Sequence, residues 1–353
     1  MRFLDKLRVA PGKCLPGRYK DYSGHPCLDV CTKRAITLNP LEIDYGLCDD
    51  CGICANACPA GALSVKESFL AEVASQAVSD TGKELRIRCS SAGGRSAAVT
   101  CLGALDYAFL DALCLKSAKD LGLLAGDCEN CGRATGGGII RSNIDAANRL
   151  LLLFGRRERI FLTRSADRHD LESGPRREMF RGIGRAISRF VPEPEDPERD
   201  RDPGPVPARQ RRSLEIIREL EEGQRNIDPC VPLPFIGKEI DADKCDGCNG
   251  LIRCVSFCPT DALEYSAEGG SAEITFKACR CIGCGLCESA CRNAAVKSFT
   301  LKSGQVEELR LTKTLMGFEA QECGGCGGIS IGMIDGLCRD CQQRKRKLEW
   351  ESV

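Results

Sequence analysis

The cysteine spacing between residues 245 and 291 constrains this chain more than any other feature. Two groups of four cysteines follow the spacing C-x2-C-x2-C-x3-C, the first with three extra residues before its third cysteine: Cys245, Cys248, Cys254 and Cys258, then Cys281, Cys284, Cys287 and Cys291. Three cysteines of one group and the last cysteine of the other can bind one iron–sulfur cube. We therefore predict two [4Fe–4S] sites, with these ligands: Cys245, Cys248, Cys254 and Cys291 for one, and Cys258, Cys281, Cys284 and Cys287 for the other.

Both groups resemble the cluster-binding runs of bacterial two-cluster ferredoxins, which implies a small module that carries single electrons. A disulfide or zinc framework is the alternative, but two interlocking runs are more specific than isolated C-x2-C pairs. The pattern returns near the N-terminus, where Cys58 ends a complete run and Cys31 stands at the position of the crossing ligand. A third [4Fe–4S] site is therefore predicted, with these ligands: Cys31, Cys48, Cys51 and Cys54.

A further site beside the third one is incomplete in the sequence. Cys14, Cys27 and Cys58 supply three thiolates, and Gly24 stands three residues before Cys27, where a fourth would be expected. His25 or a water could complete a [4Fe–4S] cluster, and three cysteines alone could hold a [3Fe–4S] cluster. The alternatives are that Cys14 binds nothing and that His25 is a surface histidine.

The overall composition is that of a metal-organised protein. A chain of 353 residues with 26 cysteines is too long for a small disulfide scaffold and fits cytosolic metal ligation. Its 50 basic and 50 acidic residues balance, so we expect no nucleic-acid partner. No signal peptide and no run of roughly 20 apolar residues is present, which predicts a cytoplasmic, soluble protein without a membrane span.

Between residues 68 and 168 the pattern alternates between helix and strand. We expect strands at 84–89, 97–105, 120–128 and 159–165 and helices at 68–80, 105–118 and 144–155. Such alternation predicts a small α/β domain with a parallel sheet. Four cysteines follow the strands, and because ligands gather at the carboxyl ends of parallel strands, they could share one site: Cys89, Cys101, Cys128 and Cys131.

The segments RIRCSSAGG, VTCLGALDYAFLDAL and LLAGDCENCG resemble the delta subunit of methyl-viologen-reducing hydrogenases over residues 84–168. That resemblance implies a [2Fe–2S] cluster at the four cysteines and an electron-accepting partner of heterodisulfide-reductase type. The paired cysteines that the family has beside Cys89 are absent, so zinc or no metal stays open. We expect Cys114 to be a core residue and the glycines at 136–138 to be a flexible connection rather than a phosphate loop.

Residues 169–212 are rich in proline and charge, which is typical of a linker, with a basic segment at 175–190. A helix at 213–223 is expected to lead into the second cysteine-rich module. Near the C-terminus two C-x2-C pairs are typical of a zinc ribbon, with rubredoxin-like iron as the alternative: Cys323, Cys326, Cys338 and Cys341. Cys230 and Cys279 receive no assignment.

The predicted fold class is a multidomain α+β and α/β protein. Its expected parts are a ferredoxin-like module at 1–67, the α/β domain at 68–168, a linker at 169–212, a helix with a second ferredoxin-like module at 213–308, and a zinc-ribbon-like tail at 309–353.

The predicted function is electron transfer. Only two histidines are present, His25 and His169, and no nucleophile or phosphate-loop motif is found, so catalysis by this chain is not expected. We expect an iron–sulfur subunit that relays electrons between ferredoxin or a flavoprotein and the catalytic subunit of a hydrogenase-type or heterodisulfide-reductase-type hetero-complex. Two alternatives are an iron–sulfur redox sensor or regulatory binding protein, and an enzyme whose substrate binds an open iron at the incomplete site.

Overall fold

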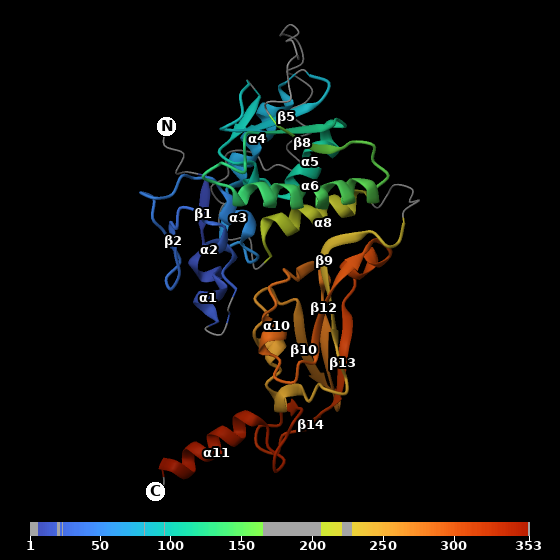
Figure 1. Ribbon diagram of the computed structural model, residues 1–353. Helices are drawn as coiled ribbons and strands as arrows, with labels where there is room; N and C mark the ends of the chain where they lie inside the picture. The colour runs from blue at the N-terminus through green and yellow to red at the C-terminus, as the bar shows by residue number, and fades with distance from the viewer. Residues whose placement is uncertain are drawn as a thin grey trace. The chain divides into compact units, whose positions relative to one another are not determined.

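The computed structural model describes residues 6–164, 206–220 and 228–351, except Lys20, Asp21, Ser23, Thr81 and Arg95. The chain divides into two compact units, Met1–Leu233 and Pro234–Val353, shown from blue to yellow and from yellow to red in Figure 1. None of the helices in the described ranges combines the length and apolar character that crossing a membrane requires. All 26 cysteines lie in the described ranges, and none forms a disulfide.

The first cysteine-rich module, residues 6–66, consists of two short antiparallel strand pairs and short helices. The pairs are β1 (Leu7–Val9) with β4 (Leu63–Val65) and β2 (Ile36–Thr37) with β3 (Glu42–Ile43). The helices are η1 (Pro11–Lys13), α1 (Leu15–Arg18), α2 (Pro26–Val30) and α3 (Ile53–Ala57). Cysteines pack among the few buried aliphatic side chains of this module, so metal binding and core formation depend on the same residues.

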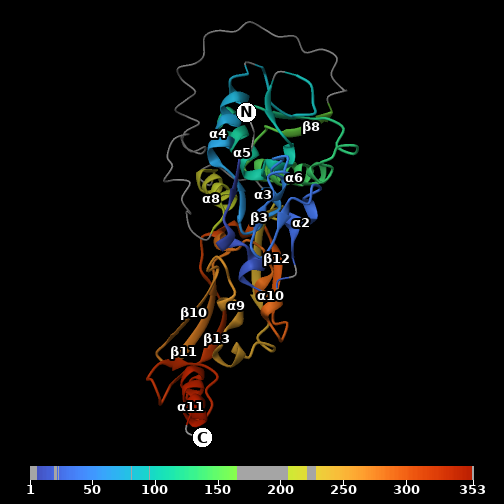
Figure 2. The same cartoon turned by 90° about the vertical axis from the view of Figure 1, so that its left-hand side faces the viewer.

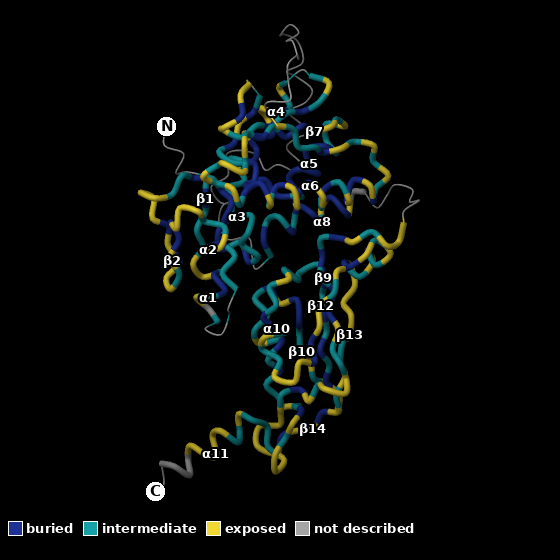
Figure 3. Tube along the Cα trace, in the orientation of Figure 1, coloured by how far each residue is buried: buried dark blue, intermediate teal, exposed yellow. Residues whose placement is uncertain are grey.

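The α/β domain that follows has one parallel sheet, as the sequence predicts. Its strand order is β6-β5-β7-β8, with β5 (Leu85–Cys89), β6 (Ala97–Val99), β7 (Leu121–Ala125) and β8 (Ile160–Arg164). The helices are α4 (Glu67–Val78), η2 (Leu102–Ala104), α5 (Tyr107–Ser117) and α6 (Thr135–Leu153). Side chains of α4, α5 and α6 form one core with the strands. Figure 3 marks the buried residues of these elements in dark blue. Cys114 is fully buried in this core, as expected.

Two local expectations for this domain are wrong. The strand expected at 97–105 ends at Val99, and the helix expected from residue 144 already begins at Thr135. The glycines at 136–138 therefore lie in the first turn of α6 and are not a flexible connection. A Cβ on Gly136 would lie 2.5 Å from the Cys101 sulfur, so this glycine permits a close approach of α6 to the thiol.

Helix α8 (Ala208–Leu220) belongs to the first unit, whereas the sequence suggested a linker up to residue 212 and a helix attached to the second module. It packs on α5, and buried Arg212 binds Asp106 at 2.5 Å and also Glu67. Burial opposes the charge of Arg212, but the two carboxylates raise its pKa above the usual value. The linker up to residue 205, including the basic segment at 175–190, lies outside the described residues.

The second cysteine-rich module, residues 232–302, repeats the layout of the first with longer strands. β9 (Pro232–Ile240) pairs with β12 (Val296–Lys302), and β10 (Leu263–Glu268) pairs with β11 (Ser271–Phe276). The short helices are η4 (Gly247–Gly250), α9 (Arg253–Ser256), η5 (Ala278–Arg280) and α10 (Leu286–Ala290).

The C-terminal segment adds to this module before it forms its own small structure. After η6 (Ser303–Leu309), strand β13 (Lys313–Glu319) extends the sheet as β10-β11-β13, which Figure 2 shows side by side. The last elements are β14 (Gln321–Glu322), β15 (Ile329–Ser330) and α11 (Arg339–Glu351). The predicted tail at 309–353 is thus continuous with the module through β13.

Candidate functional site: cysteine clusters

The two modules contain four copies of one local motif, a short helix followed by a turn, and each copy carries two cysteines. In each copy, the third cysteine of a run is the second residue of a short helix: Cys27 in α2, Cys54 in α3, Cys254 in α9 and Cys287 in α10. The crossing cysteine follows four residues later, at or just after the helix end: Cys31, Cys58, Cys258 and Cys291. A short helix followed by a turn therefore separates two cysteines that are predicted to belong to different sites.

The turn after each crossing cysteine is also repeated. The third residue after it has a positive φ in every copy: Arg34 at 52°, Gly61 at 66°, Asp261 at 49° and Ala294 at 48°. In three copies the next amide donates to the cysteine sulfur: Ala35 to Cys31 at 3.4 Å, Ala262 to Cys258 at 3.2 Å and Ala295 to Cys291 at 3.2 Å. Amide donors stabilise thiolate ligands and tune the reduction potential of a bound cluster, so the turns fit cluster binding.

Burial raises the pKa of many of these thiols. The pKa is about 11 for Cys27 and about 12 for Cys51, Cys254 and Cys281. Without metal these thiols are protonated near neutral pH, because the buried thiolate lacks solvation. Metal binding must therefore displace protons, as it does at thiolate metal sites in general.

The first module contains the incomplete site together with the third predicted site. Cys14, Cys27 and Cys58 line one cavity, and His25 lines it with them. Burial is the largest cause of the raised pKa of Cys27, and the Cys58 and Cys14 thiolates raise it further, which indicates that the three sulfurs are close together. Cys54 of the third site interacts electrostatically with Cys27, so the two sites are neighbours.

The α/β domain gathers its four cysteines at the carboxyl edge of the parallel sheet. Cys89 ends β5, Cys101 follows β6, and Cys128 and Cys131 follow β7. Burial raises the pKa of Cys101 to about 11, and Cys89 and Cys128 contribute to this shift. The Gly126 amide donates to the Cys89 sulfur at 3.2 Å. The structure thus brings the four thiols into one region.

These four sulfurs are nevertheless not arranged around a single ion. Within the described residues, ligand atoms of three or more Cys, His, Asp or Glu side chains come within 4.8 Å of one another only at the C-terminal cysteines. Zn–S bonds of about 2.3 Å hold sulfurs about 3.8 Å apart, whereas no three of these four sulfurs lie within 4.8 Å of one another.

The loop that carries Cys131 contacts the cluster-binding loops of the first module. The Thr32 hydroxyl donates to the Gly132 carbonyl at 2.6 Å, and the Thr135 hydroxyl donates to the Val30 carbonyl at 2.8 Å. Arg133 forms an ion pair with Asp49 at 2.7 Å. These contacts join residues about a hundred positions apart, so sequence patterns did not reveal them.

Two thiols from different sites lie near each other beside this contact. Helix α3, which follows Cys51, packs on η2, which follows Cys101. Burial is the largest cause of the raised pKa of Cys51, and the Cys101 thiolate adds to the shift. Cys51 belongs to the third predicted site, and Cys101 to the sheet-edge cysteines. The first module and the α/β domain therefore place two cysteine sites next to each other.

In the second module, a buried lysine lies beside one of the two predicted sites. The Lys238 side chain is 2% exposed, and its ammonium group binds Glu288 at 2.6 Å and also Ser298. Burial alone would lower the pKa of Lys238, but Cys287, Glu288 and Cys281 raise it overall. The sequence patterns did not single out this residue, although Lys238 and Glu239 interrupt an otherwise apolar strand.

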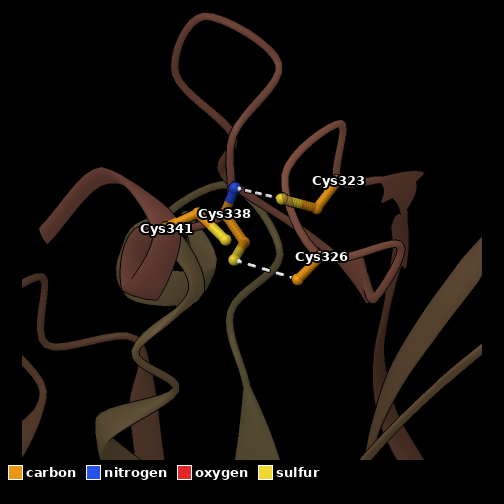
Figure 4. Close-up of side chains that lie close together, drawn as sticks. All are labelled: Cys323, Cys326, Cys338 and Cys341. Atoms are coloured by element: carbon orange, nitrogen blue, oxygen red, sulfur yellow. Dashed lines mark hydrogen bonds between the residues drawn. The ribbon is translucent and has the colours of Figure 1, made fainter. Parts of the chain in front are cut away.

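The four C-terminal cysteines form the tightest cluster of the described residues. Figure 4 shows Cys323, Cys326, Cys338 and Cys341 around one point, with 3.8 Å between the Cys326 and Cys338 sulfurs. The Cys338 and Gly325 amides donate to Cys323 at 3.1 and 3.4 Å and lower its pKa to about 6. This arrangement suits a single tetrahedral metal ion.

Comparison with known protein families identifies both cysteine-rich modules. Residues 41–64 match the 4Fe-4S binding domain, and residues 244–295 match the 4Fe-4S dicluster domain. The chain therefore contains two ferredoxin-like 4Fe-4S segments. These two matches support [4Fe–4S] binding and a role in electron transfer. No curated protein matches the chain. The α/β domain and the C-terminal cysteines lie outside the matched residues.

Proposed function

We propose that this chain is the electron-transfer subunit of a redox complex. It relays single electrons between a soluble donor, such as ferredoxin or a flavoprotein, and a catalytic subunit. The observation that carries the proposal is the closeness of Cys51 and Cys101, because it links a ferredoxin-like module to a second group of four thiols. Iron–sulfur clusters accept and release one electron and thereby supply the redox chemistry.

We propose a different metal group for each kind of cysteine set. The three complete cysteine sets of the modules fit [4Fe–4S] clusters, and Cys14, Cys27 and Cys58 fit a fourth. At the sheet edge, the wide spacing of Cys89 and its partners favours a [2Fe–2S] cluster over one zinc ion. The compact C-terminal set favours zinc.

Within the first unit, the sites form a sequence of neighbours. The incomplete site adjoins the third site through Cys27 and Cys54, and the third site adjoins the sheet-edge cysteines through Cys51 and Cys101. Electrons can thus pass along the unit in either direction. The likeness of the α/β domain to hydrogenase delta subunits suggests a complex of hydrogenase or heterodisulfide-reductase type, in the cytoplasm.

Metal analysis tests this proposal directly. Iron, acid-labile sulfide and zinc are measured per chain on anaerobically purified full-length protein. Three clusters give roughly 12 irons, a fourth gives about 16, a [2Fe–2S] cluster adds about 2, and the tail adds about one zinc. Iron at or below the content of one cluster, together with several zinc ions, would overturn electron transfer and favour a zinc-organised regulatory protein.

A second measurement tests the relay. We expect dithionite to reduce several clusters, with magnetic coupling between neighbouring reduced clusters visible by electron paramagnetic resonance. Clusters that give only isolated signals at every stage of reduction would contradict the sequence of neighbours in the first unit.

A further inference from the structure

The incomplete site in the first module has the same framework as the complete ones, but one ligand position is changed. The Cys14 amide donates to the Pro11 carbonyl at 3.0 Å after a 3-10 turn, as the Cys281 amide donates to the Ala278 carbonyl at 3.1 Å. Cys14 therefore stands where a run begins. Cys27 stands at the third ligand position of that run, and Cys58 is the predicted crossing ligand. The second ligand is missing.

In two complete runs the second ligand stands three residues before the third cysteine, as Cys51 before Cys54 and Cys284 before Cys287. A glycine in the left-handed conformation then forms the N-cap of the helix: Gly52 with φ 74° and Gly285 with φ 76°. In the Cys27 run, Gly24 occupies the position of the second ligand. The N-cap of the helix is His25, with φ −126°. The exchange places a side chain where those two runs have none.

His25 meets the conditions for a metal ligand in this place. It lines the same cavity as Cys14, Cys27 and Cys58, whose other walls include Leu15 and Leu41. Its Nδ1 atom is buried and has no hydrogen-bond partner among the described residues. A buried polar atom without a partner is costly, and coordination to a metal would remove that cost.

We propose that His25 Nδ1 is the fourth protein ligand of a [4Fe–4S] cluster held by Cys14, Cys27 and Cys58. This inference rests on the proposed function, since it assumes that the modules bind clusters. Imidazole is neutral where a thiolate carries a negative charge, and replacement of cysteine by histidine raises the reduction potential of a cluster. The potential of the cluster at the incomplete site is then higher than four cysteine ligands would give it.

The test uses full-length protein labelled with 15N-histidine and reduced stepwise without oxygen. The sequence has only two histidines, which makes the label selective. We expect one cluster signal to show 15N hyperfine coupling. His25→Ala abolishes the coupling and lowers the iron content by about one per chain, because Fe²⁺ leaves [4Fe–4S]²⁺ and a [3Fe–4S]⁰ cluster remains. The control His169→Ala retains both the coupling and the iron. Tyr22→Phe controls for the other polar side chain of the cavity and also retains both.

His25→Cys addresses the case in which the alanine variant fails to fold. It restores a four-cysteine set, so we expect full iron content, no nitrogen coupling and a lower potential for this cluster. The absence of 15N coupling in the unaltered protein, or its persistence in His25→Ala, overturns the inference. If iron analysis still shows three complete clusters, the proposed function stands; iron at or below one cluster removes both.

Discussion

The two cysteine-rich modules share their turns but differ in their surroundings. Each has two strand pairs, and the crossing cysteine is followed in every copy by a residue with positive φ. The first module is joined to an α/β domain through the Arg133–Asp49 ion pair, and one of its runs lacks a cysteine. The second module has all eight cysteines, and Lys238 lies beside one of its sites.

This difference separates the role of the local turns from the role of the residues that surround each site. The local turns position the cysteines in the same way in both modules, and the same short sequence pattern specifies these turns. The surroundings set the charge and the neighbours of each site, and these determine potentials and routes of electron transfer. Leu7 stands seven residues before Cys14, as Lys238 stands seven residues before Cys245, so the first module has an apolar residue at the corresponding place in the sequence.

The largest expected effect comes from removing a ligand in the second module. Cys281→Ser should abolish the site that it shares with Cys258 and lower the iron content by about four per chain. Cys279→Ser is the matched control two residues away and should leave the iron content unchanged. If both variants lose iron equally, the ligand assignment from the shared turns is wrong. Iron and sulfide analysis checks this.

The next effect concerns how the first unit is held together. Arg212→Met leaves Asp106 and Glu67 without their cation and should lower the free energy of unfolding of the first unit by about 3–5 kcal/mol. Arg218 is exposed on the same helix and provides the control. Arg218→Met should change the free energy of unfolding by less than about 0.5 kcal/mol. Hydrogen exchange of the α5 amides measures this change. Faster exchange in the second module as well would contradict the separation of the units.

The smallest expected effect sharpens the comparison of charges. Lys238→Met removes a buried positive charge beside Cys287 and should lower the potential of that cluster by some tens of millivolts, on the order expected for a nearby charge in protein surroundings. Potentials of the first module should stay unchanged. Lys244→Met is the control, because the Lys244 side chain is 52% exposed and solvent screens its charge. Potentiometric titration monitored by electron paramagnetic resonance measures the shift.

The sequence alone predicted much of the local structure. Cysteine spacing indicated the two ferredoxin-like modules, and alternating patterns indicated the parallel sheet, because both features depend on neighbouring residues. It also indicated that Cys114 is a core residue. It failed at Gly136, since the tight packing of this glycine on Cys101 is a contact between distant segments.

Tertiary structure decided what connects the sites. Thr32 meets Gly132, Arg133 meets Asp49, and helix α8 packs on α5, although no spacing rule relates these partners. Ligand turns are encoded within a few residues, and their geometry follows from local backbone preferences. The neighbours of a cluster come from chain segments that meet only on folding, so its environment is decided by packing and by the pairing of buried charges.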